Sequence, residues 1–155
     1  MDLKINQQRF LICGASSGFG EAVARQLISE GAKVVLVARR GELLYKKFLN
    51  AEILEGSLTD SDTIDKIVRS VEMGEFHGIL FNAGEPPTGT PLQTTIEDWD
   101  QAWPLVMSWK IDLALRIAPL LAKKGYGRML FLESQTVKQP IPSLVLSNAF
   151  RAAVV

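Results

Sequence analysis

One stretch near the amino terminus limits the folds open to this chain. Residues 10–13 are four consecutive apolar residues, and Gly14, Gly18 and Gly20 follow within the next seven positions. Residues 21–28 then carry apolar side chains at the spacing of one helix face. This order predicts a buried strand, a tight turn and a helix. Glycines allow a ligand to approach the backbone, and the N–H groups at a helix start favour an anion. The stretch therefore predicts a cradle that fits a pyrophosphate.

The surroundings of the three glycines strengthen this interpretation. Their spacing, G-x-x-x-G-x-G, is one residue wider at the front than the common dinucleotide fingerprint. A glycine triplet alone also occurs in ordinary strand-to-helix turns of α/β proteins. Here residues 33–38 form a second, nearly continuous apolar run, as expected of a parallel strand covered on both faces. The βαβ setting of a nucleotide site is therefore predicted.

The rest of the chain continues the alternation. Further strands are predicted at 51–55, 78–82 and 128–133, and further helices at 41–48, after 60, at 95–123 and at 144–155. Asp60 or Ser61 can cap the helix that follows them. The predicted fold class is α/β, with a doubly wound (Rossmann) parallel sheet of five strands, helices on both faces and the phosphate loop at the sheet's centre.

The long helix at 95–123 carries two local signals. Thr94 and Glu97 have capping-box spacing, and Pro104 predicts a kink or a restart. Its predicted buried stripe, more typical of a core or a subunit interface than of a ligand site, is Trp99, Trp103, Val106, Leu113, Ile117 and Leu120.

Composition narrows the function classes. Lys plus Arg and Asp plus Glu number 17 each, so neither nucleic acid nor an anionic membrane is favoured as a partner. The amino terminus has no hydrophobic signal core, and no apolar run approaches the roughly 20 residues of a membrane span. We expect a cytoplasmic protein. Cys13 is predicted to be a core residue, and the lone His77 excludes a multi-histidine metal site, so no metal is predicted.

The motifs together resemble the short-chain dehydrogenase/reductase family over the whole chain. The matching positions are residues 14–20, Asn82-Ala83-Gly84, Asp98-Trp99, Pro119, Gly127-Arg128 and Ser134. The resemblance implies one dinucleotide-binding domain at 1–155. Because the family's domain is longer, and because the helix at 144–155 has no stop signal, we expect 1–155 to be the amino-terminal, five-stranded part and to lack its carboxy-terminal portion.

The resemblance implies hydride transfer between a nicotinamide cofactor and a carbonyl or alcohol. Ser134 matches the family serine that hydrogen-bonds the reacting oxygen, although a cap or loop role is the alternative. The family's tyrosine, lysine and asparagine are replaced by Ser147, Arg151 and Val106. Serine is a far weaker acid than a phenol, and arginine does not give up its proton as lysine can. The sequence is thus similar to a divergent branch near the β-ketoacyl carrier-protein (3-oxoacyl) reductases.

The polar groups left for catalysis define the candidate catalytic set. It comprises Ser134, Ser147, Arg151 and Lys138, with Glu133 as a further candidate. Lys138 would be a substitute proton donor or an anion anchor, and a solvated loop lysine is its alternative.

The end of the second strand bears on the cofactor. NAD sites usually place a carboxylate there, about 20 residues beyond the glycine turn. Arg39 stands at this position and fits a 2′-phosphate, which favours NADP(H) over NAD(H); a solvated pair with Arg40 is the alternative. Ser57 stands where the family commonly has an aspartate. The predicted cofactor-binding residues are Gly14, Ser16, Ser17, Gly18, Phe19, Gly20, Arg39, Ser57, Leu58, Asn82, Ala83 and Gly84.

Three functional hypotheses follow. The first is an NADP(H)-dependent oxidoreductase for a small carbonyl or alcohol substrate, with an atypical proton donor. The second is a non-catalytic nucleotide-binding or scaffold protein on the same fold. The third is a fragment without a function of its own. We also expect a homo-oligomer that associates through the helices at 95–123 and 144–155.

Overall fold

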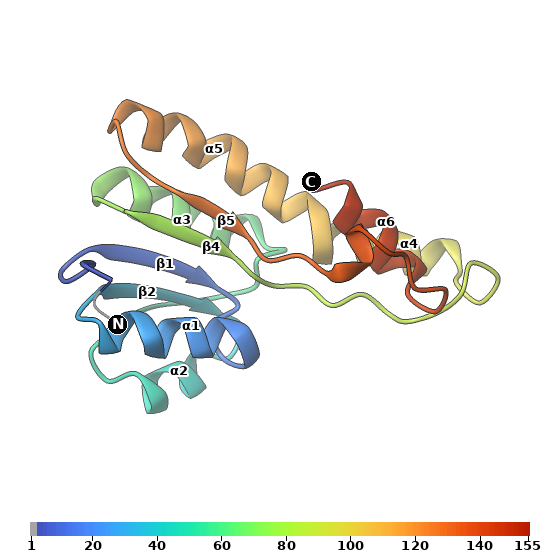
Figure 1. Ribbon diagram of the computed structural model, residues 1–155, viewed down its shortest axis with the longest axis horizontal. Coiled ribbons are helices and arrows are strands. Elements are labelled where there is room, and N and C mark those ends of the chain that lie inside the picture. The colour runs from blue at the N-terminus through green and yellow to red at the C-terminus, as the bar shows by residue number, and fades with distance from the viewer. Residues whose placement is uncertain (1–2) are drawn as a thin grey trace.

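The computed structural model describes residues 3–155, and a parallel five-stranded sheet lies at its centre (Figure 1). The sheet order is β3-β2-β1-β4-β5. The strands are β1 (Arg9–Cys13), β2 (Lys33–Ala38), β3 (Glu52–Glu55), β4 (Gly78–Phe81) and β5 (Met129–Phe131). All four pairings are parallel, so the predicted fold class is confirmed. β1 is central, and the chain crosses to opposite sides of it for β2 and β4, which places the glycine turn at the switch point of the sheet.

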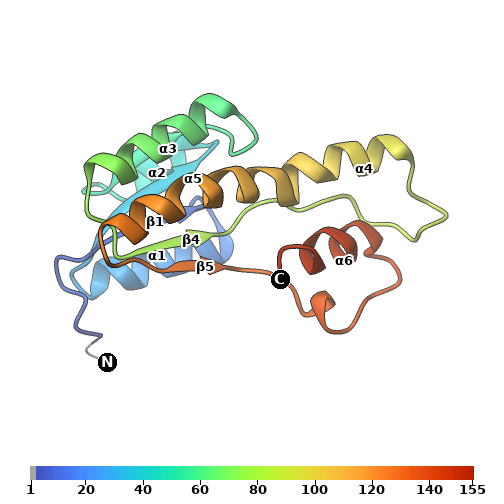
Figure 2. The same ribbon diagram turned by 90° about the horizontal axis from the view of Figure 1, so that it is seen from above.

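Helices cover both faces of the sheet (Figure 2). α1 (Gly18–Ser29) and α2 (Gly41–Lys47) pack on one face, and α3 (Ser61–Met73) and α5 (Trp109–Lys123) pack on the other. Successive side chains of β1 point to opposite faces, so Ile12 joins the core under α1 while Leu11 and Cys13 join the core under α3 and α5. Burial raises the pKa of the Cys13 thiol, in keeping with its predicted core role.

The helix predicted at 95–123 is interrupted at Pro104, where the sequence predicts a kink or a restart. It consists of α4 (Ile96–Trp103), a π-helical turn (Pro104–Ser108) and α5. Proline has no N–H to donate to the preceding turn, so one hydrogen bond of the α-helical ladder is missing at Pro104. The π-helical turn brings the backbone at Leu105 against Gly84.

Two predictions about this segment are wrong. The capping box uses Thr95 and Asp98, not Thr94 and Glu97: the helix begins one residue later, and the Thr94 hydroxyl instead accepts from the Trp99 indole at 3.4 Å. Trp103 is 44% exposed, because it ends α4 and makes its ring contact with Phe150, 6.0 Å between centroids, and not with the sheet. Trp99 and Leu120 of the predicted stripe are only partly buried, whereas Val106, Leu113 and Ile117 are fully buried as predicted.

Of the two caps predicted for the helix after residue 60, Asp60 is the one that α3 uses.

The last helix, α6 (Val145–Ala152), packs on α4 and the π-helical turn. Leu146 is fully buried there, and Phe150 contacts the rings of Trp99 and Trp103. Association of copies through these helices stays a prediction. The expectation that 1–155 is the amino-terminal part of a longer domain also stays a prediction. Across residues 3–155, no helix combines the length and the apolar character that crossing a membrane would require.

Candidate functional site

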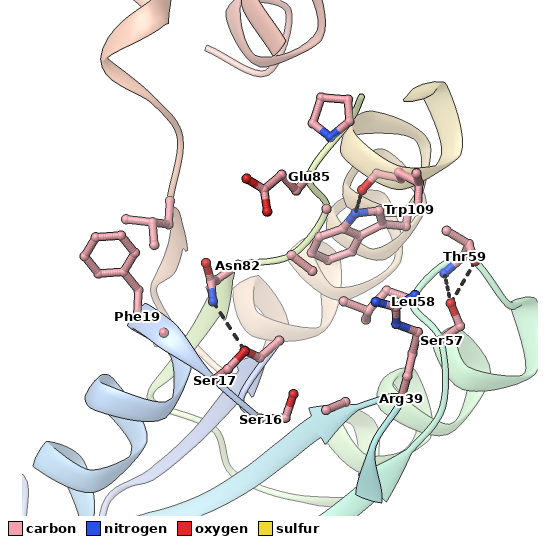
Figure 3. Close-up of a pocket in the computed structure, with 18 of the residues that line it drawn as sticks. Ser16, Ser17, Phe19, Arg39, Ser57, Leu58, Thr59, Asn82, Glu85 and Trp109 are labelled. Carbon is pink, nitrogen blue, oxygen red and sulfur yellow. Dashed lines mark hydrogen bonds between the residues drawn. The ribbon is translucent and has the colours of Figure 1, made fainter. Parts of the chain in front are cut away.

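A cleft of about 900 Å³ opens where β1, β2, β4 and β5 end (Figure 3). Its walls come from segments far apart in the sequence: the glycine turn, the loops after β2, β3 and β4, the start of α5, and α6. Of the predicted cofactor-binding residues, all but Gly20 line it. Of the predicted catalytic residues, Ser134, Ser147 and Arg151 line it and Lys138 does not.

The glycine turn is shaped by close backbone contacts. Gly14 has φ +67°, and a Cβ there would lie 1.9 Å from the Asn82 carbonyl oxygen. A Cβ on Gly20 would lie 2.3 Å from the Gly14 carbonyl oxygen, so Gly20 serves the packing of the turn behind the cleft. The Asn82 amide donates to that same oxygen at 3.5 Å. These contacts tie the turn to the end of β4.

Gly18 differs from the other two glycines of the turn. Its φ is +57°, yet no atom lies within 4 Å of the place where a Cβ would stand. Gly18 is also the first residue of α1, whose free N–H groups favour an anion. A side chain here would therefore occupy the space in which a phosphate would bind without displacing any protein atom.

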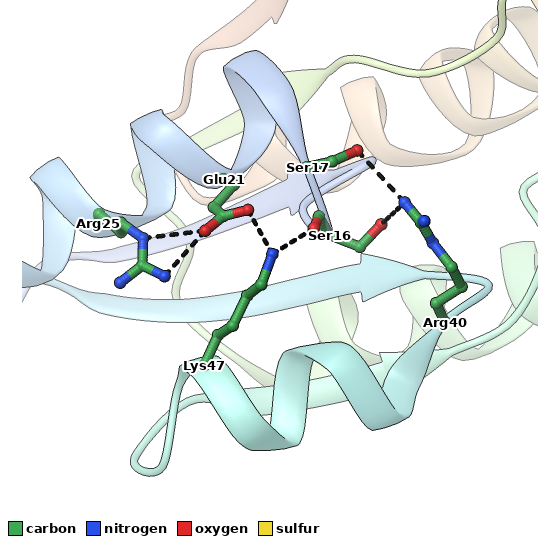
Figure 4. Close-up of polar contacts among 6 residues, drawn as sticks. All are labelled: Ser16, Ser17, Glu21, Arg25, Arg40 and Lys47. Carbon is green, nitrogen blue, oxygen red and sulfur yellow. Dashed lines mark hydrogen bonds and ion pairs between the residues drawn. The ribbon is translucent and has the colours of Figure 1, made fainter.

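Cationic side chains surround the turn (Figure 4). Arg40 donates to the hydroxyls of Ser16 and Ser17 at 3.1 and 3.3 Å. Lys47 donates to the Ser16 carbonyl at 3.0 Å and pairs with Glu21 at 2.6 Å, and this contact lowers the pKa of the Glu21 carboxyl. Of these cationic residues and Arg39, only Arg39 was predicted to bind the cofactor; it is exposed and lines the cleft (Figure 3). The adjacent arginine was visible in the sequence, but its contact with two turn hydroxyls was not.

The loop after β3 forms the far wall beyond Arg39. The Ser57 hydroxyl lies 2.8 Å from the Thr59 hydroxyl, and Leu58 is 8% exposed. Ser57 is uncharged and already has a local partner. A hydrogen bond from a ligand to this hydroxyl would therefore be weaker than one to a carboxylate.

Ser134 and Ser147 lie at the opposite end of the cleft. Ser134 caps a short 3-10 turn, where its hydroxyl accepts from the Thr136 N–H at 3.2 Å. The two roles predicted for Ser134, a helix cap and a hydrogen bond to the reacting oxygen, are compatible with each other. The capping hydroxyl also lines the cleft and keeps its hydrogen for another acceptor. Ser147, on α6, is 8% exposed and accepts from the Arg151 Nε at 3.0 Å.

Arg151 joins the Ser147 end of the cleft to a buried ion cluster. Its Nη1 donates to Glu133 at 3.2 Å and its Nη2 donates to the Gly84 carbonyl at 2.8 Å. Glu133 also pairs closely with Lys110, whose side chain is 1% exposed. Burial lowers the pKa of Lys110, although the contact with Glu133 opposes this shift.

Lys110 was missed by the sequence analysis. Its position is four residues after Val106 and three before Leu113, so it falls within the predicted buried stripe. A charged residue at the helical spacing of buried apolar residues is the sequence signal that could have identified Lys110. Val106, which stands where the resemblance implies an asparagine, is fully buried and supplies no polar group.

The remaining candidates lie apart from the cleft. Lys138 is not brought to Ser134 and Ser147, because it ends the 3-10 turn that Ser134 begins and is exposed there, outside the lining of the cleft. The His77 imidazole accepts from the Arg9 N–H at 3.2 Å. No cluster of three or more metal-ligating side chains occurs within residues 3–155.

Comparison with known proteins gives the same class as the fold. The profile of the short chain dehydrogenase family matches residues 8–155. The chain therefore belongs to the short chain dehydrogenase family. It is 26% identical to an uncharacterised oxidoreductase of Staphylococcus epidermidis over 97% of this chain and 68% of that protein. It is 23% identical to the uncharacterised oxidoreductase YvrD of Bacillus subtilis, over 100% of this chain and 62% of that protein.

Solved structures of similar proteins agree with this membership. A short-chain dehydrogenase of Streptomyces avermitilis superposes with a TM-score of 0.87 at 26% identity, over 96% of this chain and 57% of that one. L-sorbose reductase of Gluconobacter frateurii, solved with NADPH and L-sorbose, gives a TM-score of 0.88 at 28% identity over 99% of this chain and 62% of that one. The chain thus spans about three fifths of the length of these structures.

Proposed function

We propose that this protein is an NADP(H)-dependent oxidoreductase that reduces a small carbonyl compound or oxidises the corresponding alcohol. One observation carries the proposal: a single cleft joins a glycine turn open at Gly18 to two serines, Ser134 and Ser147, at its other end. A dinucleotide bound along this cleft would have its pyrophosphate at the start of α1 and its nicotinamide near the serines.

The cationic residues after β2 favour the phosphorylated cofactor. Arg39 lines the cleft, and the Arg40 guanidinium already bridges the hydroxyls of Ser16 and Ser17. A guanidinium binds a phosphate through two parallel hydrogen bonds, whereas a ribose 2′-hydroxyl prefers a carboxylate acceptor. The relative solved with NADPH, L-sorbose reductase, is consistent with this preference.

The serines supply the hydrogen bonds that carbonyl reduction needs. A bound nicotinamide would supply the hydride. Ser134 and Ser147 each keep a hydroxyl hydrogen that can be donated to the oxygen on which negative charge develops. The Arg151 guanidinium beside Ser147 stabilises negative charge on that hydroxyl as its proton moves to the product oxygen. Trp109 lines the cleft and stacks on Phe81 of the core with ring centroids 5.9 Å apart.

Replacement of Ser147 by alanine tests this assignment. With a reducible carbonyl and NADPH, Ser147→Ala is expected to lower kcat by about a hundredfold, the usual contribution of a positioned proton donor. NADPH affinity should change little, because the charged groups of the cofactor would be bound at the glycine turn and Arg39, whereas Ser147 would contact the substrate oxygen. The measurements are the loss of nicotinamide absorbance during turnover and a fluorescence titration with NADPH.

Ser143 offers a matched control for this test. It is an exposed serine four residues away that does not line the cleft, and Ser143→Ala should leave kcat unchanged. Equal kcat in Ser147→Ala and the unaltered protein would contradict the role of Ser147 as donor.

One observation favours the alternative of a non-catalytic nucleotide-binding protein. No tyrosine or lysine is among the described residues that line the cleft, and Ser147 and Arg151 stand where the resemblance implies these two groups. The alternative predicts NADPH binding without turnover of any carbonyl. It also predicts that Ser147→Tyr combined with Arg151→Lys creates a reductase activity that the unaltered protein lacks.

A further inference from the structure

Three charged side chains form a buried cluster where α5, α6 and the end of β5 meet. One carboxylate oxygen of Glu133 accepts from the Lys110 ammonium, and the other accepts from Arg151 Nη1 at 3.2 Å. The side chains of Lys110, Glu133 and Arg151 are 1%, 9% and 14% exposed. Removing such charges from water costs free energy that apolar side chains of similar volume would not. Stability alone therefore does not account for the cluster.

We propose that Lys110 and Glu133 are positioning residues, which hold the Arg151 guanidinium so that the Ser147 hydroxyl directs its hydrogen into the cleft. The inference rests on the proposed function, because it concerns the geometry of the proton donor in that reaction. Neither Lys110 nor Glu133 is asked to transfer a proton. Their effect passes through Arg151 to Ser147.

Arg151 is fixed by contacts on all three of its nitrogens. Nη1 donates to Glu133, Nη2 donates to the Gly84 carbonyl at 2.8 Å, and Nε donates to Ser147 Oγ at 3.0 Å. The guanidinium is planar and rigid, so three partners in different directions leave it one orientation. A lysine at this position could not make the same set of directed contacts.

The contact with Arg151 determines what the Ser147 hydroxyl can do. Because Nε is a donor, Ser147 Oγ must accept in this bond, and its own hydrogen is left over. Within residues 3–155 no acceptor bonds to that hydrogen, and Ser147 lines the cleft. The hydroxyl is therefore held as a donor toward any oxygen bound beside it.

Lys110 acts from behind Glu133. It does not line the cleft, and its ammonium lies against the carboxylate oxygen that Arg151 does not use. A carboxylate with one partner could rotate about its side-chain torsions, whereas one held at both oxygens is fixed. The lysine thus fixes the acceptor to which Arg151 is bound.

A charge-conserving pair of substitutions tests this role. The double variant Lys110→Met and Glu133→Met removes one cation and one anion and puts apolar side chains of similar volume in their place. Replacing a buried ion pair in this way usually leaves a protein folded. In the presence of a reducible carbonyl, kcat is expected to fall by about a hundredfold, as when a reacting group is misplaced by about 1 Å. NADPH affinity is expected to stay the same, because the cluster lies away from the glycine turn.

A second readout does not depend on turnover. In protein labelled with ¹⁵N-arginine, the Arg151 Nε–H proton, assigned through Arg151→Lys, should exchange slowly with water in the unaltered protein and rapidly in the pair variant. The matched control is Asp65→Asn with Arg116→Gln, which removes the exposed ion pair between α3 and α5. This control should change neither the exchange rate nor kcat.

The outcomes separate the two proposals. Rapid exchange together with reduced kcat in the pair variant supports the positioning role. Unchanged exchange, or faster exchange with an unchanged kcat, overturns it. If the unaltered protein binds NADPH but reduces no carbonyl, the proposed oxidoreductase function fails, and the exchange rates alone decide whether Lys110 and Glu133 orient Arg151.

Discussion

Replacing Gly18 by aspartate is expected to weaken NADPH binding strongly while the protein stays folded. The position has φ +57°, which aspartate and asparagine tolerate better than other non-glycine residues, and a Cβ there meets no atom within 4 Å. The new carboxylate would stand where we propose that the pyrophosphate binds. Two unit charges about 4 Å apart repel by about 4 kcal/mol at an effective dielectric constant of about 20. At about 1.4 kcal/mol for each tenfold change, the affinity should fall at least about a hundredfold.

The neutral variant Gly18→Asn separates charge from volume. It has nearly the same shape and backbone tolerance as the aspartate variant, so it should lose much less affinity. Both are compared with the unaltered protein by the change in nicotinamide fluorescence, with circular dichroism as the check on folding. Equal NADPH affinity in all three proteins would show that the cofactor does not bind at the start of α1.

Replacing Glu133 by glutamine is expected to lower the free energy of unfolding by about 3 kcal/mol, the lower end of the usual cost of breaking a buried ion pair. The variant leaves Lys110, which is 1% exposed, with a charge that nothing balances. Denaturation by guanidinium chloride measures this change. Asp65→Asn, in a pair with 37% and 44% exposed side chains, should cost less than about 1 kcal/mol.

The stability deficit of Glu133→Gln should also depend on pH. Burial lowers the pKa of Lys110, so the folded protein releases this proton at a lower pH than the unfolded chain. The unfolded state then binds more protons, and the unfolding free energy rises with pH between the two pKa values. Without Glu133 the pKa of Lys110 is lowered further in the folded protein, so the unfolding free energy of the variant rises more with pH than that of the unaltered protein. The difference in stability between the two proteins should therefore shrink as the pH approaches the ordinary lysine pKa of about 10.4. A deficit below about 1 kcal/mol at neutral pH, no larger than that of an exposed pair, would mean that Lys110 is not held as a buried cation.

Much of the fold could be predicted because apolar runs and glycines report directly on buried strands and turns. The run at 33–38 is β2 with the same bounds, and the central place of the glycine turn followed from parallel crossovers. The cap of α4 was misplaced by one residue because Thr94 and Thr95 are adjacent and each has an acid three positions on. Only the backbone angle at the helix start distinguishes them.

The site was less predictable because its polar contacts join residues distant in sequence. The cleft brings together most of the predicted residues, but the partners that orient them were not visible. Lys110 and Glu133 are 23 positions apart, and their pairing depends on how α5 crosses the end of β5. Arg40 reaches Ser16 and Ser17 from 24 and 23 positions away. Periodicity identifies the face on which a residue lies, and it does not identify the charged group that another element places opposite.

The most direct test of the account is a pair of titrations of the unaltered protein, one with NADPH and one with NADH, repeated on Arg39→Asp. NADPH is expected to bind the unaltered protein more tightly than NADH by about tenfold or more, because of a charge-assisted contact to the 2′-phosphate. Arg39→Asp should reverse the preference, because a carboxylate repels the phosphate and accepts from the 2′-hydroxyl. Arg69→Asp, at an exposed arginine on α3 outside the cleft, should change neither affinity. Equal affinity for the two nucleotides, or binding of neither, would contradict the account.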